Sequence, residues 1–134
     1  MGETDWRELS AAQWRARLTP AQYQVLREQG TEPAFSGALW DQHAPGVYAC
    51  AGCGQELFRA EDKFDSGTGW PSFSAAMARE LLELREDKSL LMRRTEVLCA
   101  RCGGHLGHVF PDGPPPTNLR FCMNSAALSF KPKA

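Results

Sequence analysis

The sequence predicts a mainly β domain with short helices at its N-terminus, and three observations carry this prediction. Residues 5–30 place apolar side chains at helical spacing between charged ones. From residue 31 onward, Gly, Pro and Asp separate short apolar runs, as is typical of short strands joined by turns. Two Cys-x-x-Cys pairs lie within that second region. We therefore expect one domain over residues 1–134, with helices at about 5–30 and a β core at about 45–130.

Two helices are expected in the N-terminal quarter. The first, over 5–18, is indicated by apolar residues that alternate with charged ones: Trp6, Leu9, Trp14 and Leu18. The second begins with Thr19 as N-cap and Pro20 at the first helical position. Gly30 is a plausible end for it, because glycine follows many helix C-termini.

The expected strands are short and apolar, at residues 47–49, 56–58, 90–92, 96–98 and 119–123. Residues 75–84 fit either a helix or a strand, because their apolar residues are too dense for periodicity to decide. The run of three prolines at 114–116 predicts a stiff surface connection within the same domain.

Composition excludes several functions. With 15 basic and 16 acidic residues, the formal net charge is −1, which argues against a nucleic-acid binder or a polybasic membrane anchor. No apolar run approaches the roughly 18 residues that span a bilayer. The first residues are charged and lack the apolar region of a secretory signal, so we expect a cytoplasmic protein with reduced thiols. A monomer is the default expectation.

The two cysteine pairs, Cys50 with Cys53 and Cys99 with Cys102, share one pattern and are each followed by glycine. Four thiolates on two tight turns suit tetrahedral zinc at about 2.3 Å per Zn–S bond. Such a site has no open position, so the zinc would be structural. It would clamp two hairpin-like turns of a larger sheet. The alternative is that each pair is a redox dithiol or a disulfide.

The fifth cysteine, Cys122, is left over from the two pairs. If residues 119–125 form a strand, Arg120, Cys122 and Asn124 point to one face while Phe121 and Met123 point to the core. A guanidinium beside the thiol favours the thiolate, which is the nucleophilic form. The alternative is an inert buried cysteine, since free cysteine is among the most buried residue types.

Two histidines follow the second cysteine pair in a glycine-rich run. Close to a thiolate, His105 and His108 can donate protons, because the imidazole pKa lies near working pH. The alternative is a loop whose histidines face solvent.

A loop with two glycines precedes Trp70 and Pro71. Proline favours an extended conformation for the residue before it, so the indole can form the apolar wall of a small-ligand site. The alternative is a tryptophan of the core.

Together these segments resemble the B-type methionine sulfoxide reductases, the peptide-methionine (R)-S-oxide reductases. The resemblance covers nearly the whole chain from about residue 12. Its matching segments are Leu18-Thr19-Pro20, Thr31-Glu32-Pro33, Cys50-x-x-Cys53-Gly54, the loop from Phe64 through Gly69-Trp70-Pro71 to Phe73, Arg94-Thr95-Glu96-Val97, Cys99-x-x-Cys102, the run from His105 to Phe110, Asp112-Gly113-Pro114 and Arg120-Phe121-Cys122-x-Asn124-Ser125.

The resemblance implies a fold of two small antiparallel sheets with N-terminal helices, the β-tent of that family, clamped by one structural zinc. It implies thiol-dependent reduction of methionine-R-sulfoxide, free or in proteins, through a sulfenic acid on Cys122. It places proton donors at His108, the principal acid, and His105, with Asn124 as a further partner. Substrate contacts fall on Trp70 and Phe110, and supporting residues on Glu86, Asp112 and Arg120.

One position departs from the commonest family pattern. Many members carry a second, resolving cysteine where this chain has Thr68, and some carry it where this chain has Ser36. With four cysteines on zinc, no thiol remains to form a disulfide with Cys122. Either a thioredoxin-like protein or a small thiol reduces the sulfenic acid directly, or Ser36 replaces a native cysteine. The alternative from another class of function is a non-catalytic zinc adaptor that binds protein or nucleic acid. It would predict a basic patch or exposed aromatic residues on strands, and the near-neutral net charge does not support it.

Overall fold

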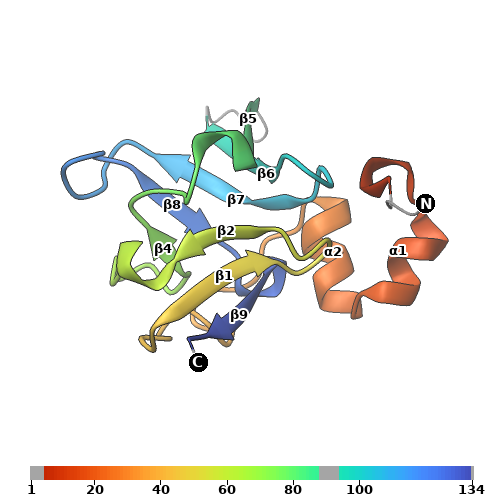
Figure 1. Ribbon diagram of the computed structural model, residues 1–134, viewed down its shortest axis with the longest axis horizontal. Coiled ribbons are helices and arrows are strands. Elements are labelled where there is room, and N and C mark those ends of the chain that lie inside the picture. The colour runs from red at the N-terminus through yellow and green to blue at the C-terminus, as the bar shows by residue number, and fades with distance from the viewer. Residues whose placement is uncertain (1–4, 88–93, 134) are drawn as a thin grey trace.

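The computed structural model describes residues 5–87 and 94–133, so the strand expected at 90–92 lies outside the described residues. Helical segments gather at one end of the molecule, beside the sheets (Figure 1). They are the 3-10 turn η1 (Trp6–Glu8) and the helices α1 (Ala11–Arg17) and α2 (Pro20–Glu28).

The single helix expected over 5–18 is wrong, because the chain breaks before α1. Ser10 forms a capping box with Gln13: its hydroxyl accepts from the Gln13 N–H and its own N–H donates to the Gln13 side chain. The second expected helix is confirmed. Thr19 caps it and Pro20 is its first residue, and it ends at Glu28, one residue before a left-handed Gln29.

The strands form two antiparallel sheets, as the fold class predicted. The three-stranded sheet has the order β2-β1-β9, with β1 (Gly46–Cys50), β2 (Glu56–Arg59) and β9 (Leu128–Pro132). The six-stranded sheet has the order β3-β4-β8-β7-β6-β5. Its strands are β3 (Lys63–Phe64), β4 (Ser72–Phe73), β5 (Leu82–Asp87), β6 (Arg94–Cys99), β7 (His105–Phe110) and β8 (Arg120–Met123). Short 3-10 turns lie at η2 (Ala60–Asp62), η3 (Arg79–Leu81) and η5 (Ser125–Ala127).

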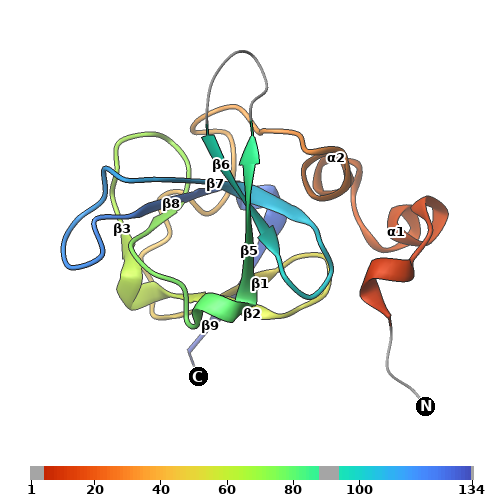
Figure 2. The ribbon, with the colours of Figure 1, turned by 90° about the horizontal axis from the view of Figure 1, so that it is seen from above.

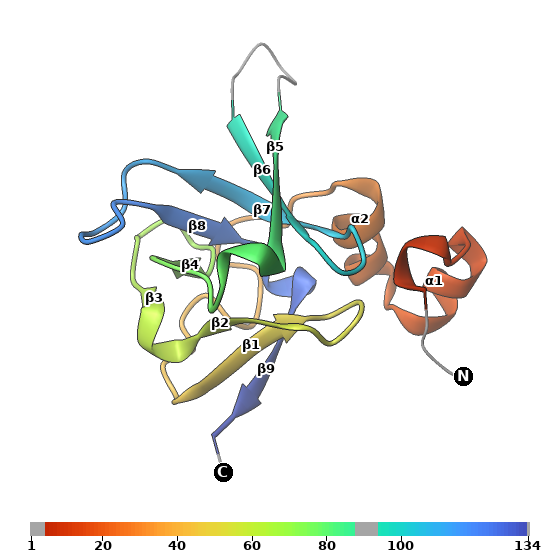
Figure 3. The same ribbon diagram turned by 45° about the horizontal axis from the view of Figure 1, so that its top comes forward.

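Aromatic side chains from both sheets meet in the core. Phe58 of β2 stacks on Phe73 of β4 with ring centroids 4.4 Å apart, and it also meets Phe121 of β8 at 5.9 Å. Tyr48 of β1 contacts Phe73 edge-on at 5.0 Å. All four rings are buried, so the two sheets share one apolar interior. Figures 2 and 3 show the β5–β6 hairpin rising from this body, on the side away from β9.

The structure corrects two sequence interpretations. Residues 75–84 are neither one helix nor one strand, since a 3-10 turn at Arg79–Leu81 leads into β5. The run from His105 to Phe110 is a strand, so the alternative of a solvent-facing loop is wrong. Gly107 is required within that strand, because a Cβ there would lie 2.1 Å from the carbonyl oxygen of Cys122 on β8.

Candidate functional site

Four buried cysteines form a compact cluster next to the helical end of the molecule. The sulfurs of Cys50 and Cys102 lie 3.7 Å apart, those of Cys53 and Cys99 lie 3.6 Å apart, and all four fall within 4.8 Å of one another. Ligands at 2.3 Å around a tetrahedral zinc would have sulfurs about 3.8 Å apart. The donor set and its spacing therefore fit a closed tetrahedral metal site.

Each pair lies on a turn of the same construction. Gly54 donates its backbone N–H to Cys50 O and Gly103 donates to Cys99 O, both at 2.8 Å. Both glycines have left-handed φ, 83° and 76°, which L side chains rarely adopt. The first turn joins β1 to β2 and the second joins β6 to β7. The cluster thus connects turns of the two different sheets, where the sequence suggested two turns of one larger sheet.

Crowding of the four sulfurs changes their acidity. The hydrogen bond to Cys102 is the largest cause that raises the pKa of Cys50, and it is also the largest cause that lowers the pKa of Cys53. Protons are therefore shared unequally among thiols that lie this close together. Full ionisation of all four sulfurs needs a cation to balance their charge.

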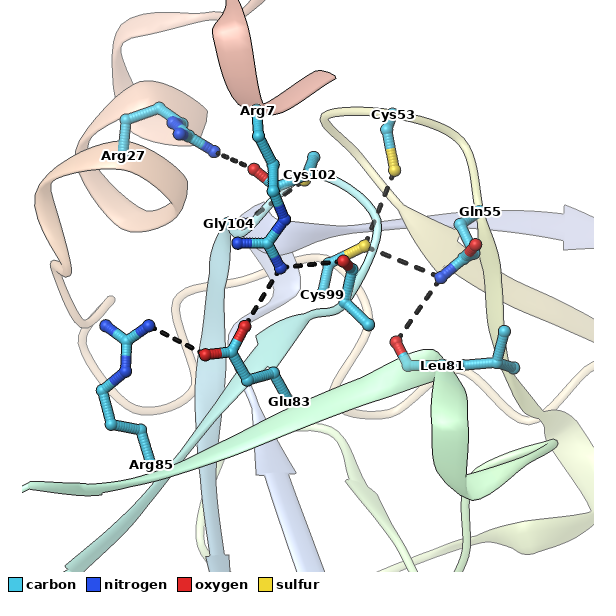
Figure 4. A network of polar contacts seen from close by, with 11 residues as sticks. Arg7, Arg27, Cys53, Gln55, Leu81, Glu83, Arg85, Cys99, Cys102 and Gly104 are labelled. Atoms are coloured by element: carbon cyan, nitrogen blue, oxygen red, sulfur yellow. Dashed lines mark hydrogen bonds and ion pairs between the residues drawn. The ribbon is translucent and has the colours of Figure 1, made fainter. Parts of the chain in front are cut away.

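Three arginines of the helical segment donate hydrogen bonds to carbonyl oxygens of the two cysteine turns. They are Arg7 to Ala100 at 2.8 Å, Arg17 to Gly52 at 3.1 Å and Arg27 to Cys102 at 3.0 Å. Arg7 also pairs with Glu83 of β5 at 3.0 Å, and Gln55 reaches both Cys99 Sγ and the Leu81 carbonyl (Figure 4). The helices are thereby fastened to the cluster through backbone atoms of its own turns.

The fifth cysteine opens into a separate pocket of about 250 Å³. The pocket is lined by Thr31, Thr68, Trp70, Arg94, Gly107, His108, Phe110, Arg120, Cys122 and Asn124. Six of these residues were singled out from the sequence. They come from the loop before β4, from β7, from β8 and from the position directly after β8, segments that lie apart in the chain.

Strand β8 presents its residues as the sequence predicted. Phe121 and Met123 are buried in the core, whereas Arg120 and Cys122 share the opposite face and line the pocket. Cys122 pairs with His108 across β7 and β8. Residues directly opposite on antiparallel strands have Cβ atoms about 4.5–5.5 Å apart. The register therefore places an imidazole next to the thiol.

Arg120 is held from two sides. Its guanidinium donates to both carboxylate oxygens of Asp112, at 2.9 and 3.1 Å, and lies 4.4 Å from the ring centre of Phe110. The hydrogen bond to Arg120 is the main cause that lowers the pKa of Asp112. A cation beside the thiol is thus fixed in place by an ion pair and an aromatic face.

The net acidity of Cys122 differs from the sequence expectation. Burial raises the pKa of the Cys122 thiol above its ordinary value, and the charge of Arg120 and the hydroxyl of Thr68 offset only part of this effect. The guanidinium acts in the predicted direction, but desolvation outweighs it. The resting group is therefore a thiol whose ionisation depends on these two neighbours.

Trp70 and Asn124 line the pocket and are both tied to one residue, Glu32. The indole Nε1 donates to Glu32 O at 2.9 Å, and the Glu32 N–H donates to Asn124 Oδ1 at 3.0 Å. Asn124 is buried and also donates to Leu106 O at 3.1 Å. The indole is half-buried, so it forms a wall of the pocket rather than part of the core.

Three predicted site residues are not among those that line the pocket: Asp112, which holds Arg120, and also His105 and Glu86. His105 is buried behind His108, with ring centroids 5.4 Å apart, and its Nδ1 lies 2.7 Å from Glu96 Oε2. Glu86 is exposed on β5, away from the pocket lining. Their roles stay predictions.

Other residues of this region carried no predicted role. Thr31, Arg94 and Gly107 line the pocket, and Glu96 holds His105. Thr31 and Arg94 lie in segments that carried the family resemblance, but only their place in the fold shows that they reach Cys122. Glu96 is a charged residue inside an apolar run, which is a sequence signal for a buried partner.

The two positions considered for a second cysteine differ in location. Thr68 lines the thiol pocket and its hydroxyl interacts with Cys122. Ser36 is exposed, donates to Pro33 O at 2.5 Å and lines a different hollow, beside α2 and η5. A thiol at position 68 would therefore be near Cys122 in this conformation.

Fold and site together define a class of protein: a mainly β domain with a closed four-cysteine cluster and a separate cysteine in a polar–aromatic pocket. The model of the SelR domain matches residues 18–132. The chain belongs to the SelR domain family.

The matches to curated relatives extend over most of this chain and most of each relative. Three of them are named "Peptide methionine sulfoxide reductase MsrB". The protein of Thiobacillus denitrificans is 63% identical over 91% of this chain and 92% of its own. The protein of Bradyrhizobium diazoefficiens is 57% identical over 92% of this chain and 89% of its own length. The protein of Methanosarcina barkeri is 56% identical over 92% of this chain and 87% of its own length. Among the residues described, no helix is both long and apolar enough to cross a bilayer.

Proposed function

We propose that this chain is a thiol oxidoreductase that reduces methionine-R-sulfoxide, free or in proteins, to methionine. One observation carries the proposal: the Cys122 thiol opens into a small pocket beside His108, its cross-strand neighbour, and the Trp70 indole. The names of the relatives support the reaction class. The pocket volume of about 250 Å³ suits a single side chain rather than a larger cofactor.

The proposed step transfers one oxygen atom and two electrons. The Cys122 thiolate attacks the sulfoxide sulfur, whose oxygen gains negative charge and takes a proton. This attack forms a sulfur–sulfur bond between Cys122 and the substrate. That bond and the substrate sulfur–oxygen bond then break while the hydroxyl group moves to the Cys122 sulfur, so methionine leaves with the electron pair and Cys122 becomes a sulfenic acid. The methionine sulfur is reduced by two electrons and the Cys122 sulfur is oxidised by two.

Residues around the thiol have distinct proposed roles. His108 is the principal acid that protonates the developing oxyanion, because it lies opposite Cys122 in the β7–β8 register. Trp70 and Phe110 form apolar walls for the methyl and methylene groups of the substrate. Asn124 supplies a further hydrogen bond.

Supporting residues act through those that face the pocket. Arg120, held by Asp112, stabilises the thiolate. We propose that His105 assists as a donor behind His108, and that Glu86 has a supporting role at the β5–β6 edge.

Regeneration needs an external reductant. The chain has five cysteines, and four of them form the buried cluster. An external thiol attacks the sulfenic acid, water leaves, and a mixed disulfide forms; a second thiol releases Cys122 and carries away the disulfide. We propose a thioredoxin-like protein as this reductant, in a cytoplasmic monomer.

We propose that zinc occupies the four-cysteine cluster, one ion per chain. Cys50, Cys53, Cys99 and Cys102 would hold it as thiolates. A closed tetrahedral set leaves no open position, so the ion supplies cross-linking of the two sheets and no chemistry at Cys122.

The activity is tested with dabsyl-methionine-R-sulfoxide and dithiothreitol, with the S epimer as control. The R epimer should be consumed and the S epimer should persist. One equivalent of R-sulfoxide without thiol, followed by a sulfenate trap and intact mass, should place the trapped oxygen on Cys122. Stoichiometric reduction by Cys122→Ser would overturn the assignment of the nucleophile.

A further inference from the structure

Asn124 lies at the N-cap of the turn η5 (Ser125–Ala127), but its side chain does not cap that turn. Asparagine is a preferred N-cap residue because its side-chain oxygen accepts from the N–H groups of the turn that follows. In the described structure the Asn124 side chain makes no such hydrogen bond. Its Oδ1 accepts from Glu32 N at 3.0 Å and its Nδ2 donates to Leu106 O. The side chain is thus kept away from its own turn.

The carboxylate of Glu32 takes the place that Asn124 leaves. Glu32 Oε1 accepts from the backbone N–H of Ala126, inside η5, at 2.9 Å. A backbone N–H at the start of a helical turn has no partner within the turn, and a carboxylate is well suited to accept from it. One side chain therefore satisfies the turn while the backbone N–H of the same residue holds the Asn124 amide.

The other side of Glu32 reaches the opposite wall of the pocket. Its carbonyl oxygen accepts from Trp70 Nε1 at 2.9 Å. Glu32 therefore joins three groups: the turn after Cys122, the Asn124 amide and the Trp70 indole. Both side chains that it holds line the thiol pocket, whereas the Glu32 side chain does not.

The segment around Glu32 is seated closely on η5. Leu39 N–H donates to Ser125 Oγ at 3.2 Å. A Cβ at Gly37 would lie 2.4 Å from Glu32 Oε2 and 2.3 Å from Ser125 Oγ, so the chain passes directly over the carboxylate. The carboxylate thus lies between two segments, and its Oε2 atom is buried.

We propose that Glu32 is a positioning residue, which keeps Asn124 facing the pocket and fixes the Trp70 wall opposite it. This inference rests on the proposed reduction of methionine sulfoxide at Cys122. Without the carboxylate, the Asn124 side chain turns to cap its own turn and withdraws from the substrate. The backbone of Glu32 then shifts and the Trp70 indole loses its fixed orientation.

The test compares Glu32→Ala with Glu32→Gln and with Glu28→Ala, a change at an exposed glutamate that ends α2. Glu32→Ala should lower kcat/KM between about 10- and 100-fold, with effects on both kcat and KM. Glu32→Gln keeps an acceptor for Ala126 N–H and should stay within about threefold of the parent chain. Glu28→Ala should leave activity unchanged.

A spectroscopic readout separates positioning from a loss of stability. With 5-fluorotryptophan incorporated, the Trp70 ¹⁹F signal, identified by Trp70→Phe, should shift or broaden in Glu32→Ala and return in Glu32→Gln. The side-chain amide signals of Asn124 should move in parallel. These signals report the geometry even if the chain proves inactive toward sulfoxides, in which case the proposed function fails and the positioning role stands. Unchanged signals and activity in folded Glu32→Ala would overturn the inference.

Discussion

The two cysteine sites lie near opposite ends of one strand, β7, and the chain closes them to different degrees. Next to the start of β7, the four cluster cysteines are 0–7% exposed, and their sulfurs lie within 4.8 Å of one another. Toward its other end, Cys122 opens into a pocket of about 250 Å³. The cluster is built from two hairpin turns, whereas the pocket collects side chains from several strands and loops.

This difference separates stability from chemistry. The closed thiols lie close together on arginine-held turns of the two sheets, so we expect them to fix the sheets to each other. Burial raises the pKa of the open thiol, Arg120 and Thr68 offset part of that rise, and His108 lies opposite the thiol in the sheet. We therefore expect its reactivity to be set by neighbours that can be changed one at a time. Loss of the cluster should therefore lower stability, whereas loss of the Cys122 site should lower activity.

Metal removal should have the largest effect, and on the fold. Structural zinc contributes roughly 10 kcal/mol or more to folding in small zinc domains, so a chelator should release one metal per chain and unfold the protein. Near-UV circular dichroism and metal analysis measure both changes. The change Cys99→Ser should act in the same way. Retention of a cooperative thermal transition in the metal-free protein would contradict a structural role.

Cys122→Ser should abolish turnover while leaving the cluster end intact. The hydroxyl of serine is a poor nucleophile toward sulfur, so activity should fall by about four orders of magnitude or to background. Metal content and Tm should match the parent chain, because Cys122 lies outside the cluster. Measurement of kcat and Tm in both variants distinguishes the two sites: Cys122→Ser should lose kcat alone, whereas Cys99→Ser should also lose Tm. Loss of metal from Cys122→Ser would show that the sites are coupled.

Sequence patterns captured local features well. The alternation on β8 predicted which side chains enter the core, and the Cys-x-x-Cys-Gly pattern predicted two tight turns. The relation between the turns did not follow, because nothing local shows that the turn after Cys50 and the turn after Cys99 belong to different sheets. Long-range pairing also decides which of the two histidines lies beside the thiol. His108 and His105 look alike in sequence, but only the β7–β8 register places His108 opposite Cys122.

Glycine and burial explain two further differences. The glycines around His105 and His108 favour a loop, yet Gly107 is in a strand because β8 passes too close for any side chain. The thiol was expected to be activated by Arg120, but its net pKa is raised because desolvation depends on the whole fold. Strand 119–123 could be predicted locally; the environment of its cysteine could not.

The two histidines should differ in how much activity they control. His108→Gln removes the proposed acid of the pocket and should lower kcat about 100-fold, within the usual range for general acid catalysis. His105→Gln should lower kcat less, about tenfold, and should also reduce Tm, because it breaks a buried contact with Glu96. Steady-state kinetics gives kcat and thermal denaturation gives Tm for the two variants. Equal losses of kcat without a change of Tm would place both histidines at the substrate.

Arg27→Gln should weaken the cluster end with little effect on the pocket. It removes a hydrogen bond to Cys102 O and a guanidinium 4.5 Å from the ring centre of Trp14, so unfolding should become easier by about 1–2 kcal/mol. Urea denaturation measures this change, and Arg59→Gln, at the exposed end of β2, is the matched control. A loss of kcat at unchanged stability would argue that the helices act on the pocket instead.

The smallest expected effect concerns the pH dependence of Cys122. Its pKa is already raised by burial, and Arg120 opposes that rise, so Arg120→Gln should raise the pKa further. At a pH below this pKa, less thiolate is then present, and alkylation of Cys122 should slow about two- to fivefold while the midpoint of its pH profile moves to higher pH. Arg120→Lys keeps the charge and should lie between the variant and the parent chain. Iodoacetamide rates, assigned to Cys122 by peptide mass, measure the shift. A midpoint that moves to lower pH in Arg120→Gln would mean that the guanidinium does not stabilise the thiolate, and that the open site is controlled by Thr68 and His108 alone.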